Sequence, residues 1–131
     1  MKILIADDDY ACRALLAGIL SKMPEHQVTI AEDGKTAWEM LDDAGRFFDV
    51  AFLDIAMPAP DGLEILKRVA DVPHLRSIAV VICTASNDRT TIGKAIAAGA
   101  RHYVVKPCVE ATIVAKLQQI EAIHSLTAKQ G

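Results

Sequence analysis

Five short runs of apolar and β-branched residues alternate along the chain with segments of helical spacing, and this alternation leaves few folds open. The runs are Lys2–Ala6, Val28–Ala31, Val50–Asp54, Ile78–Thr84 and His102–Lys106. Residues 50–53 and 78–82 are continuously apolar rather than alternating. That pattern is typical of strands buried on both faces of a parallel sheet.

Each run is followed by a segment in which apolar residues recur three or four positions apart. Leu16, Ile19 and Leu20 form such a stripe after the first run, and Ile113 and Leu117 begin another after the last. Because parallel crossovers are right-handed in nearly all cases, helices should cover both faces of one sheet. We therefore expect an α/β fold with a doubly wound, five-stranded parallel sheet.

Length and charge narrow the classes of function. The chain has 131 residues, which suits one domain, and we expect it to span 1–126 with a short polar tail over 127–131. The net charge of −3 argues against DNA or RNA binding through bulk electrostatics. No apolar run approaches the ~20 residues of a membrane span, and the N-terminus does not resemble a signal peptide.

The cysteines and histidines follow no metal-binding pattern. The three cysteines form no CxxC pair, which favours reduced thiols in a cytoplasmic protein. The four histidines are scattered and are interpreted as surface or loop residues.

Polar residues end four of the five predicted strands. Asp7, Asp8 and Asp9 follow the first run, while Asp54, Thr84 and Lys106 end the third, fourth and fifth. In open α/β sheets, ligands bind beyond the carboxyl ends of the strands. These side chains are therefore candidates for one site.

Carboxylates gathered at one edge repel each other, by about 4 kcal/mol for a pair ~4 Å apart at an effective dielectric constant of 20. Lys106 or a bound Mg²⁺ can offset this repulsion. A set of Asp, Mg²⁺, hydroxyl and Lys is the outline of a phosphoryl-transfer site. Each residue alone also has a structural interpretation: a helix N-cap among 7–9, a turn at Asp54, a structural Thr84 and a solvated Lys106.

Taken in order, the motifs resemble those of two-component response-regulator receiver domains, of the single-domain chemotaxis-regulator type. The resemblance covers about residues 2–125. The matching segments are 3–9, 31–34, 52–58, 61–62, 84–85, 97–100 and 103–107. It implies a (βα)5 flavodoxin-like fold with strand order 2-1-3-4-5.

The resemblance also implies roles for individual residues. Asp54 matches the phosphoacceptor, Asp8 the direct Mg²⁺ ligand, and Asp7 its partner, which acts largely through water. Ala56 lies where a backbone carbonyl binds the metal. Asp9 falls beyond the acidic pair and is not expected to be a ligand.

Three further residues match the parts that respond to the phosphoryl group. Thr84 matches the hydroxyl that contacts it, Lys106 the lysine that pairs with it, and Tyr103 the aromatic switch residue. The Lys106-Pro107 bond matches a peptide bond that is cis in the family.

The implied function is a phosphorylation-activated signalling switch and phosphoprotein, not an enzyme beyond weak self-phosphorylation and autodephosphorylation. A histidine kinase or histidine phosphotransfer protein would phosphorylate Asp54 in a Mg²⁺-dependent reaction. The aspartyl phosphate would then change a protein-binding surface on the fourth helix, fifth strand and fifth helix. Its output would be binding to another protein or a phosphorylation-dependent dimer, and we expect a stand-alone receiver.

Two other functions stay open. One is a receiver-like pseudo-domain used only for assembly. The other is an aspartyl-nucleophile phosphatase of the haloacid-dehalogenase type, which needs Asp-x-Asp followed by Gly-Thr, whereas Tyr10-Ala11 follow Asp9 here.

Several positions depart from the family pattern. Ala56 and Ser86 stand where polar side chains often tune dephosphorylation, so slow intrinsic dephosphorylation is predicted. Pro60 is a second proline in one short loop, and because each proline fixes a backbone φ angle, the loop is expected to be less mobile than in the family. Gly93, inside the fourth helical segment, suggests either close packing or a soft switch helix.

Overall fold

A computed structural model describes the backbone of residues 1–85 and 89–130, with side chains to residue 126. It contains one sheet of five parallel strands in the order β2-β1-β3-β4-β5. The strands are β1 (Lys2–Ala6), β2 (Gln27–Ala31), β3 (Val50–Asp54), β4 (Ala79–Thr84) and β5 (His102–Val105). The predicted fold class and strand order are confirmed.

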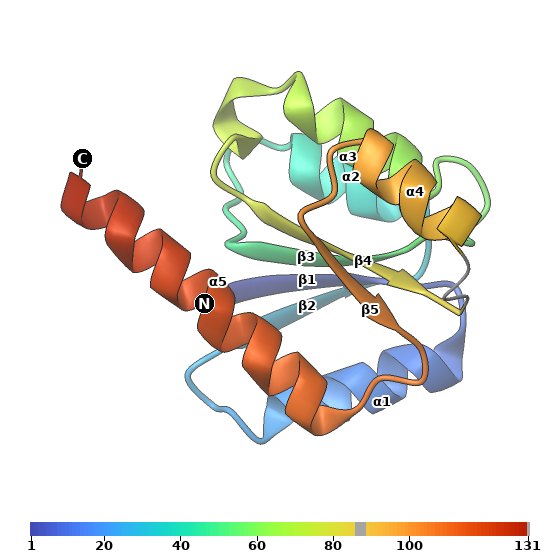
Figure 1. The fold of residues 1–131 in the computed structure, drawn as a ribbon, viewed down its shortest axis with the longest axis horizontal. Helices are drawn as coiled ribbons and strands as arrows, with labels where there is room; N and C mark the ends of the chain where they lie inside the picture. Colours follow the sequence, from blue (N-terminus) through green and yellow to red (C-terminus); the bar gives the residue numbers. More distant parts are fainter. Residues whose placement is uncertain (86–88, 131) are drawn as a thin grey trace.

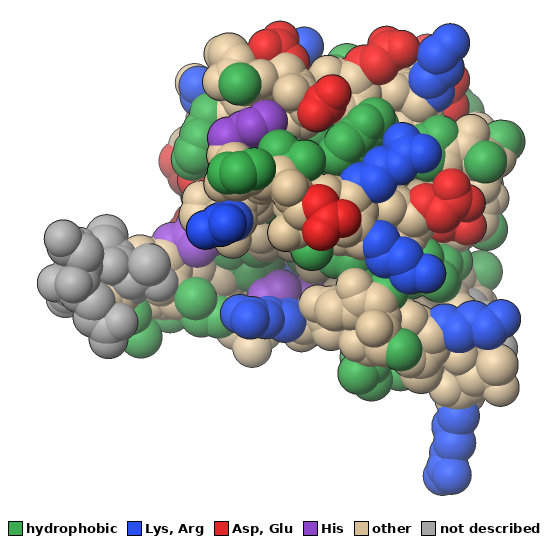
Figure 2. All heavy atoms as spheres, turned by 90° about the horizontal axis from the view of Figure 1, so that it is seen from above, with side chains coloured by type: hydrophobic (Ala, Val, Ile, Leu, Met, Phe, Trp, Pro, Cys, Tyr) green, Lys and Arg blue, Asp and Glu red, His purple; other side chains and the backbone are tan. Residues whose placement is uncertain are grey.

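Helices form a layer on each side of the sheet (Figure 1). The helices are α1 (Tyr10–Ser21), α2 (Gly34–Asp42), α3 (Gly62–Ala70), α4 (Arg89–Ala97) and α5 (Glu110–Gln130), with a short 3-10 turn η1 (Pro73–Leu75). Helices α1 and α5 cover one face, whereas α2, α3 and α4 cover the other (Figure 1). Seen over α2–α4, acidic and basic side chains are interspersed around small hydrophobic areas (Figure 2).

The central strands are apolar throughout because both of their faces are buried. Ile3 and Ile5 pack on the side of α1 and α5, while Leu4 and Ala6 pack on the side of α2–α4. Burying one such Ile or Leu side chain contributes about 1.5–3 kcal/mol. Strand β5 lies at the sheet edge, and its side chains alternate between buried and exposed.

Element boundaries differ from the sequence prediction by a residue or two, with one larger exception. Strand β5 ends at Val105, although the Lys106 N–H still donates to the Thr84 carbonyl at 2.7 Å. Helix α4 ends at Ala97, and Gly99 then adopts a φ of 101°, a conformation that glycine tolerates. Helix α5 continues to Gln130, through most of the segment predicted to be a polar tail.

Two of the four histidines are buried, and one of them, His102, contradicts the prediction that all lie on the surface or in loops; His26 lies in the loop before β2. His26 is 9% exposed, and its Nδ1 lies 2.9 Å from the N-terminal nitrogen. His102 is 6% exposed because it occupies an inward-facing position of β5. Among the described residues, its Nδ1 has no hydrogen-bond partner.

Aspartates begin three of the helices. Asp9 accepts a hydrogen bond from the Ala11 N–H, Asp33 from the Thr36 N–H, and Asp61 from the Glu64 N–H. These bonds satisfy N–H groups that have no partner within the helix. Each cap fixes where the chain leaves the carboxyl edge of the sheet.

Candidate phosphoacceptor site

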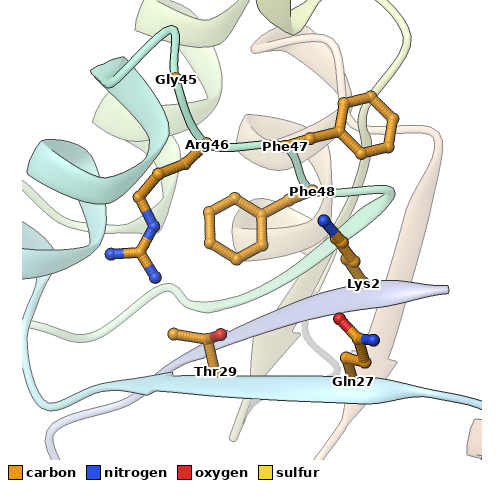
Figure 3. A pocket seen from close by; sticks show the side chains of 7 residues that line it. All are labelled: Lys2, Gln27, Thr29, Gly45, Arg46, Phe47 and Phe48. Atoms are coloured by element: carbon orange, nitrogen blue, oxygen red, sulfur yellow. The ribbon is translucent and has the colours of Figure 1, made fainter.

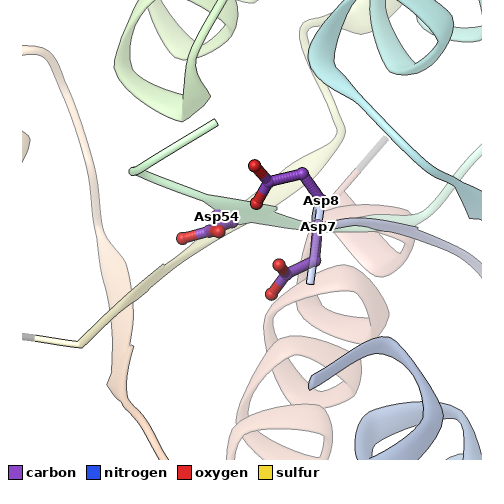
Figure 4. Close-up of side chains that lie close together, drawn as sticks. All are labelled: Asp7, Asp8 and Asp54. Carbon is purple, nitrogen blue, oxygen red and sulfur yellow. The ribbon is translucent and has the colours of Figure 1, made fainter. Parts of the chain in front are cut away.

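Three carboxylates meet at the carboxyl edge of the sheet. Asp7 and Asp8 follow β1, and Asp54 is the last residue of the adjacent β3. One oxygen from each lies within 4.8 Å of the other two. Figure 4 shows the three carboxylates projecting toward the same side. Asp7 and Asp54 are buried and Asp8 is exposed, so a charge bound between them would face solvent on the Asp8 side.

Lys106 neutralises part of this acidic cluster. Its Nζ lies 2.6 Å from Asp7 Oδ2 and 3.3 Å from Asp54 Oδ2. Burial lowers the pKa of the Lys106 ammonium, but the hydrogen bond to Asp7 and the charges of Asp54 and Asp7 outweigh burial and raise that pKa above its ordinary value. The ammonium therefore stays charged inside the site.

The Asp54 carboxylate is held from its own loop. The Ala56 N–H donates to Asp54 Oδ1 at 3.2 Å. Burial raises the pKa of Asp54, and the nearby charge of Asp7 raises it further, against the opposing effects of the Ala56 N–H and Lys106. A cation that enters the cluster would relieve this electrostatic cost.

Gly62 allows α3 to begin directly behind Asp54. A Cβ at Gly62 would lie 2.6 Å from the Asp54 carbonyl oxygen, closer than real Cβ contacts allow. The Asp61-Gly62 pair thus combines an N-cap with a close backbone approach. The sequence marked this pair only as a family motif.

The structure also places the other predicted site residues. Thr84 is buried at the end of β4, beside β5, and Tyr103 is 42% exposed on the outer side of β5. Ala56 is exposed just beyond Asp54. Ser86 lies outside the described residues.

The contacts of Asp9 decide which residue among 7–9 is the helix N-cap. Its side chain caps α1 and also accepts a hydrogen bond from the Cys12 thiol, with Sγ 3.5 Å from Oδ2. The N-cap interpretation therefore holds for Asp9. Asp7 and Asp8 point instead into the cluster with Asp54.

Prolines shape two segments near the site. The Lys106-Pro107 bond is cis, as the resemblance implied, and the Ala59-Pro60 bond is also cis. A Cβ at Gly34 would collide with the Pro60 carbonyl oxygen, so the loop after β3 packs tightly on the start of α2. At Gly93, by contrast, a Cβ would meet no atom within 4 Å, so close packing does not explain that glycine.

Sequence spacing missed one grouping beside the site. Cys83 of β4 and Cys108 of the turn after β5 belong to the same core cluster, between the sheet and helices α1 and α5. Only the strand order and register bring them together.

A hollow lies at the opposite edge of the sheet (Figure 3). Its lining includes Lys2 and Thr29 from β1 and β2, and Phe48 from the loop before β3. Because it borders the amino ends of β1 and β3, it is separate from the carboxylate cluster.

Comparison with known proteins agrees with this geometry. The family model for the response regulator receiver domain matches residues 3–118. The chain is 31% identical to chemotaxis protein CheY1 of Helicobacter pylori, over 92% of this chain and 96% of that protein. It is 35% identical to CheY-3 of Vibrio cholerae, over 92% of this chain and 91% of that protein.

Solved structures are also similar. CheY4 of Vibrio cholerae matches with a TM-score of 0.81 and 26% identity, covering 91% of this chain and 97% of that one. A putative response regulator from Chloroflexus aurantiacus matches with a TM-score of 0.84 and 26% identity, covering 92% and 97%. The chain belongs to the response regulator receiver domain family, and its relatives include chemotaxis regulators of the CheY type.

Proposed function

We propose that Asp54 accepts a phosphoryl group from a phosphohistidine of a histidine kinase or histidine phosphotransfer protein. The observation that carries this proposal is the buried Asp54 carboxylate, held beside Asp7, Asp8 and the Lys106 ammonium. A carboxylate can act as a nucleophile toward phosphorus, and a neighbouring cation offsets negative charge on the transferred group. Asp54 also accepts a hydrogen bond from the N–H of Ala56, in the loop that follows β3.

The carboxylate cluster fits Mg²⁺. Receiver domains bind Mg²⁺ in an acidic pocket, and carboxylates with a backbone carbonyl are ligands that Mg²⁺ prefers. Asp8, Asp54 and the Ala56 carbonyl would hold the ion, with Asp7 acting largely through water. When bound, Mg²⁺ neutralises charge on the transferring phosphoryl group.

Phosphorylation adds a charge of about −1.5 to −2 at Asp54. Thr84 and Lys106 would engage this group from the ends of the next two strands, and Tyr103 would then change its rotamer. Tyr103 and Val105 of β5 and Ile96 of α4 are exposed hydrophobic side chains, and Ile96 is 60% exposed. The surface of α4, β5 and α5 is the proposed output surface, for a protein partner or a second copy of this chain.

A protein with this function is a regulator. Its own catalytic activity would be limited to weak self-phosphorylation and autodephosphorylation. Among the described residues, no helix is long and apolar enough to cross a membrane. We propose a cytoplasmic location and a receiver domain over residues 1–126.

Acetyl phosphate with Mg²⁺ tests the phosphoacceptor directly. The wild-type protein should take up one phosphoryl group, visible on a phosphate-affinity gel, whereas Asp54→Asn should take up none. Asp49→Asn is the matched control, because Asp49 lies at the far edge of the sheet, where its side chain accepts a hydrogen bond from the Lys2 N–H. Unchanged uptake by Asp54→Asn would refute the assignment, and no uptake by the wild type from any donor would favour a pseudo-receiver.

A further inference from the structure

The hollow at the amino edge of the sheet gathers polar side chains that the proposed function does not use (Figure 3). It has a volume of about 280 Å³ and lies between strands β1 and β2 and the loop that joins α2 to β3. Lys2 pairs with Gln27 in the parallel register, and Thr29 follows two residues later on β2. Because side chains alternate along a strand, Gln27 and Thr29 project to the same face. That face is the one covered by α2–α4, since Leu4, the partner of Thr29, packs there.

The loop that closes the hollow is held at both ends. At its start, the Asp43 side chain accepts a hydrogen bond from the Gly45 N–H at 2.8 Å, and the Asp43 carbonyl accepts one from the Arg46 N–H at 3.0 Å. At its end, the Asp49 N–H donates to the Lys2 carbonyl and the Lys2 N–H donates to Asp49 Oδ2, both at 2.8 Å. The backbone around the hollow is therefore fixed by the fold itself, which lowers the ordering cost of binding a ligand there.

Two cationic side chains line the hollow without a carboxylate beside them. Within residues 1–85 and 89–126, no carboxylate lies within ion-pair distance of the Lys2 ammonium or the Arg46 guanidinium. The aspartates at the two ends of the loop, Asp43 and Asp49, accept hydrogen bonds from backbone N–H groups instead. Positive charge is thus concentrated at this edge of a chain whose net charge is −3.

The Phe48 ring separates the two cations. Phe48 is 7% exposed, and the Arg46 guanidinium lies 5.6 Å from the centroid of its ring. Figure 3 shows the Lys2 ammonium on the other side of that ring. A guanidinium stacked on a ring keeps its N–H donors in its own plane, where they can bind both oxygens of a carboxylate. A ligand that meets both cations must therefore carry two anionic groups joined by an apolar segment.

We propose that this hollow binds a short aliphatic dicarboxylate. One carboxylate pairs with Arg46 and the other with Lys2, while the methylene chain lies against Phe48. The Thr29 hydroxyl and the Gln27 amide donate to the remaining carboxylate oxygens. A volume of about 280 Å³ suits a small ligand, near the lower end of the ~300–1,000 Å³ range of ligand sites. Because the hollow lies at the edge opposite the carboxylate cluster, this binding does not depend on the proposed function.

Titration with glutarate, followed through the amide signals in ¹H–¹⁵N spectra, tests the proposal. Mg²⁺ is left out because carboxylates bind it, and the ionic strength is held constant. We expect saturable shifts at Thr29 and at residues 45–48, and none at residues 54–56 of the carboxyl edge. Butyrate, which has a single carboxylate on a similar chain, should bind about 10-fold more weakly, because it cannot pair with both cations.

Variants of the two cations locate the binding. Arg46→Gln and Lys2→Gln should each weaken glutarate binding by about 10-fold, whereas Lys2→Arg keeps the charge and should retain binding. Lys67→Gln is the matched control, because Lys67 is an exposed lysine of α3 that does not line the hollow. It should bind glutarate like the wild type. Circular dichroism checks that each variant folds.

Several results would overturn the proposal. These are shifts that do not saturate, equal affinity for butyrate and glutarate, equal weakening in Lys67→Gln and Arg46→Gln, and shifts centred on residues 54–56. The variant Asp54→Asn should bind glutarate like the wild type. Since none of these measurements uses a phosphoryl donor, their failure is distinct from a failure of the proposed function.

Discussion

Lys106 is closer to Asp7 than to the proposed phosphoacceptor: its Nζ lies 2.6 Å from Asp7 Oδ2 but 3.3 Å from Asp54 Oδ2. In this state, the lysine is held mainly by the aspartate that follows β1, the strand next to the β3 strand of Asp54. A phosphoryl group on Asp54 would compete with Asp7 for the same ammonium. The Lys106–Asp7 pair is therefore a contact that phosphorylation would have to weaken.

This pair should be energetically coupled. Lys106→Met leaves two buried carboxylates without their cation, so we expect the free energy of unfolding to fall by about 3–5 kcal/mol in metal-free buffer. Asp7→Asn removes one of those charges, and the double variant should lose less than the sum of the single losses. Urea unfolding of the four proteins measures the coupling, and additive losses would contradict it.

Replacing Asp8 should distinguish two effects of its carboxylate on stability: repulsion of the neighbouring carboxylates and binding of Mg²⁺. Because Asp8 is exposed, Asp8→Ala should stabilise the metal-free protein by only about 1 kcal/mol, toward the high-dielectric limit of the Coulomb energy. Adding Mg²⁺ should raise the urea midpoint of the wild type more than that of the variant. A lower urea midpoint for Asp8→Ala than for the wild type in metal-free buffer would contradict repulsion among the clustered carboxylates. Asp42→Ala on α2 is the control for the loss of one negative charge elsewhere.

His102 should make stability depend on pH. Burial lowers its pKa in the folded state, with further lowering by Lys116 and Arg101. The folded state thus resists protonation, so this contribution to stability is complete above the unfolded-state pKa of about 6.5 and is lost as the pH falls through it. The added slope is at most about 1.4 kcal/mol per pH unit.

The variant His102→Leu should flatten the fall in stability between pH 7 and pH 5, as measured by urea midpoints at each pH. His124→Gln serves as the control, because His124 lies on α5 and is half-buried. If His102→Leu retains the full wild-type slope, another group causes it.

Gly62 and Gly93 should respond in opposite ways to alanine. A Cβ at Gly62 would meet the Asp54 carbonyl oxygen at 2.6 Å, so Gly62→Ala should cost about 1–3 kcal/mol and slow phosphoryl uptake. A Cβ at Gly93 would meet nothing within 4 Å, so Gly93→Ala should stabilise the protein by about 0.5–1 kcal/mol. Thermal unfolding compares the two, and a destabilised Gly93→Ala would show that α4 needs the glycine.

The lifetime of the phosphorylated state should be long, and this expectation rests on the proposed function. Ala56 is exposed beside Asp54 but has no side-chain group that could orient an attacking water. Ala56→Asn should speed hydrolysis by about 10-fold, equal to about 1.4 kcal/mol in activation free energy. Decay of labelled protein after removal of the donor measures this rate, with Ala59→Asn in the same loop as the control. Equal decay in the wild type and Ala56→Asn would show that this position does not set the lifetime.

Burial on both faces made the central strands predictable. Strands β1 and β3 have the predicted bounds. Because both faces of these strands are buried, a side chain that points to either face is apolar along most of each strand. The carboxyl-edge residues Asp7, Asp8, Asp54 and Lys106 were also predictable as a group, since parallel strands end at one edge. The receiver motifs are local and ordered, so the family could be identified from the residues alone.

Contacts between distant segments depended on the tertiary structure. His102 could not be distinguished from a surface histidine, because its burial depends on the edge strand turning that side chain toward α5. Asp7 could not be identified as the nearest partner of Lys106, since sub-ångström differences between two carboxylates follow from strand register and twist. Cys83 and Cys108 likewise share one core cluster only because β4 and β5 are neighbours, a relation that no residue spacing encodes. Local sequence thus determined the elements and the set of chemical groups, whereas long-range packing decided which groups touch and which are removed from water.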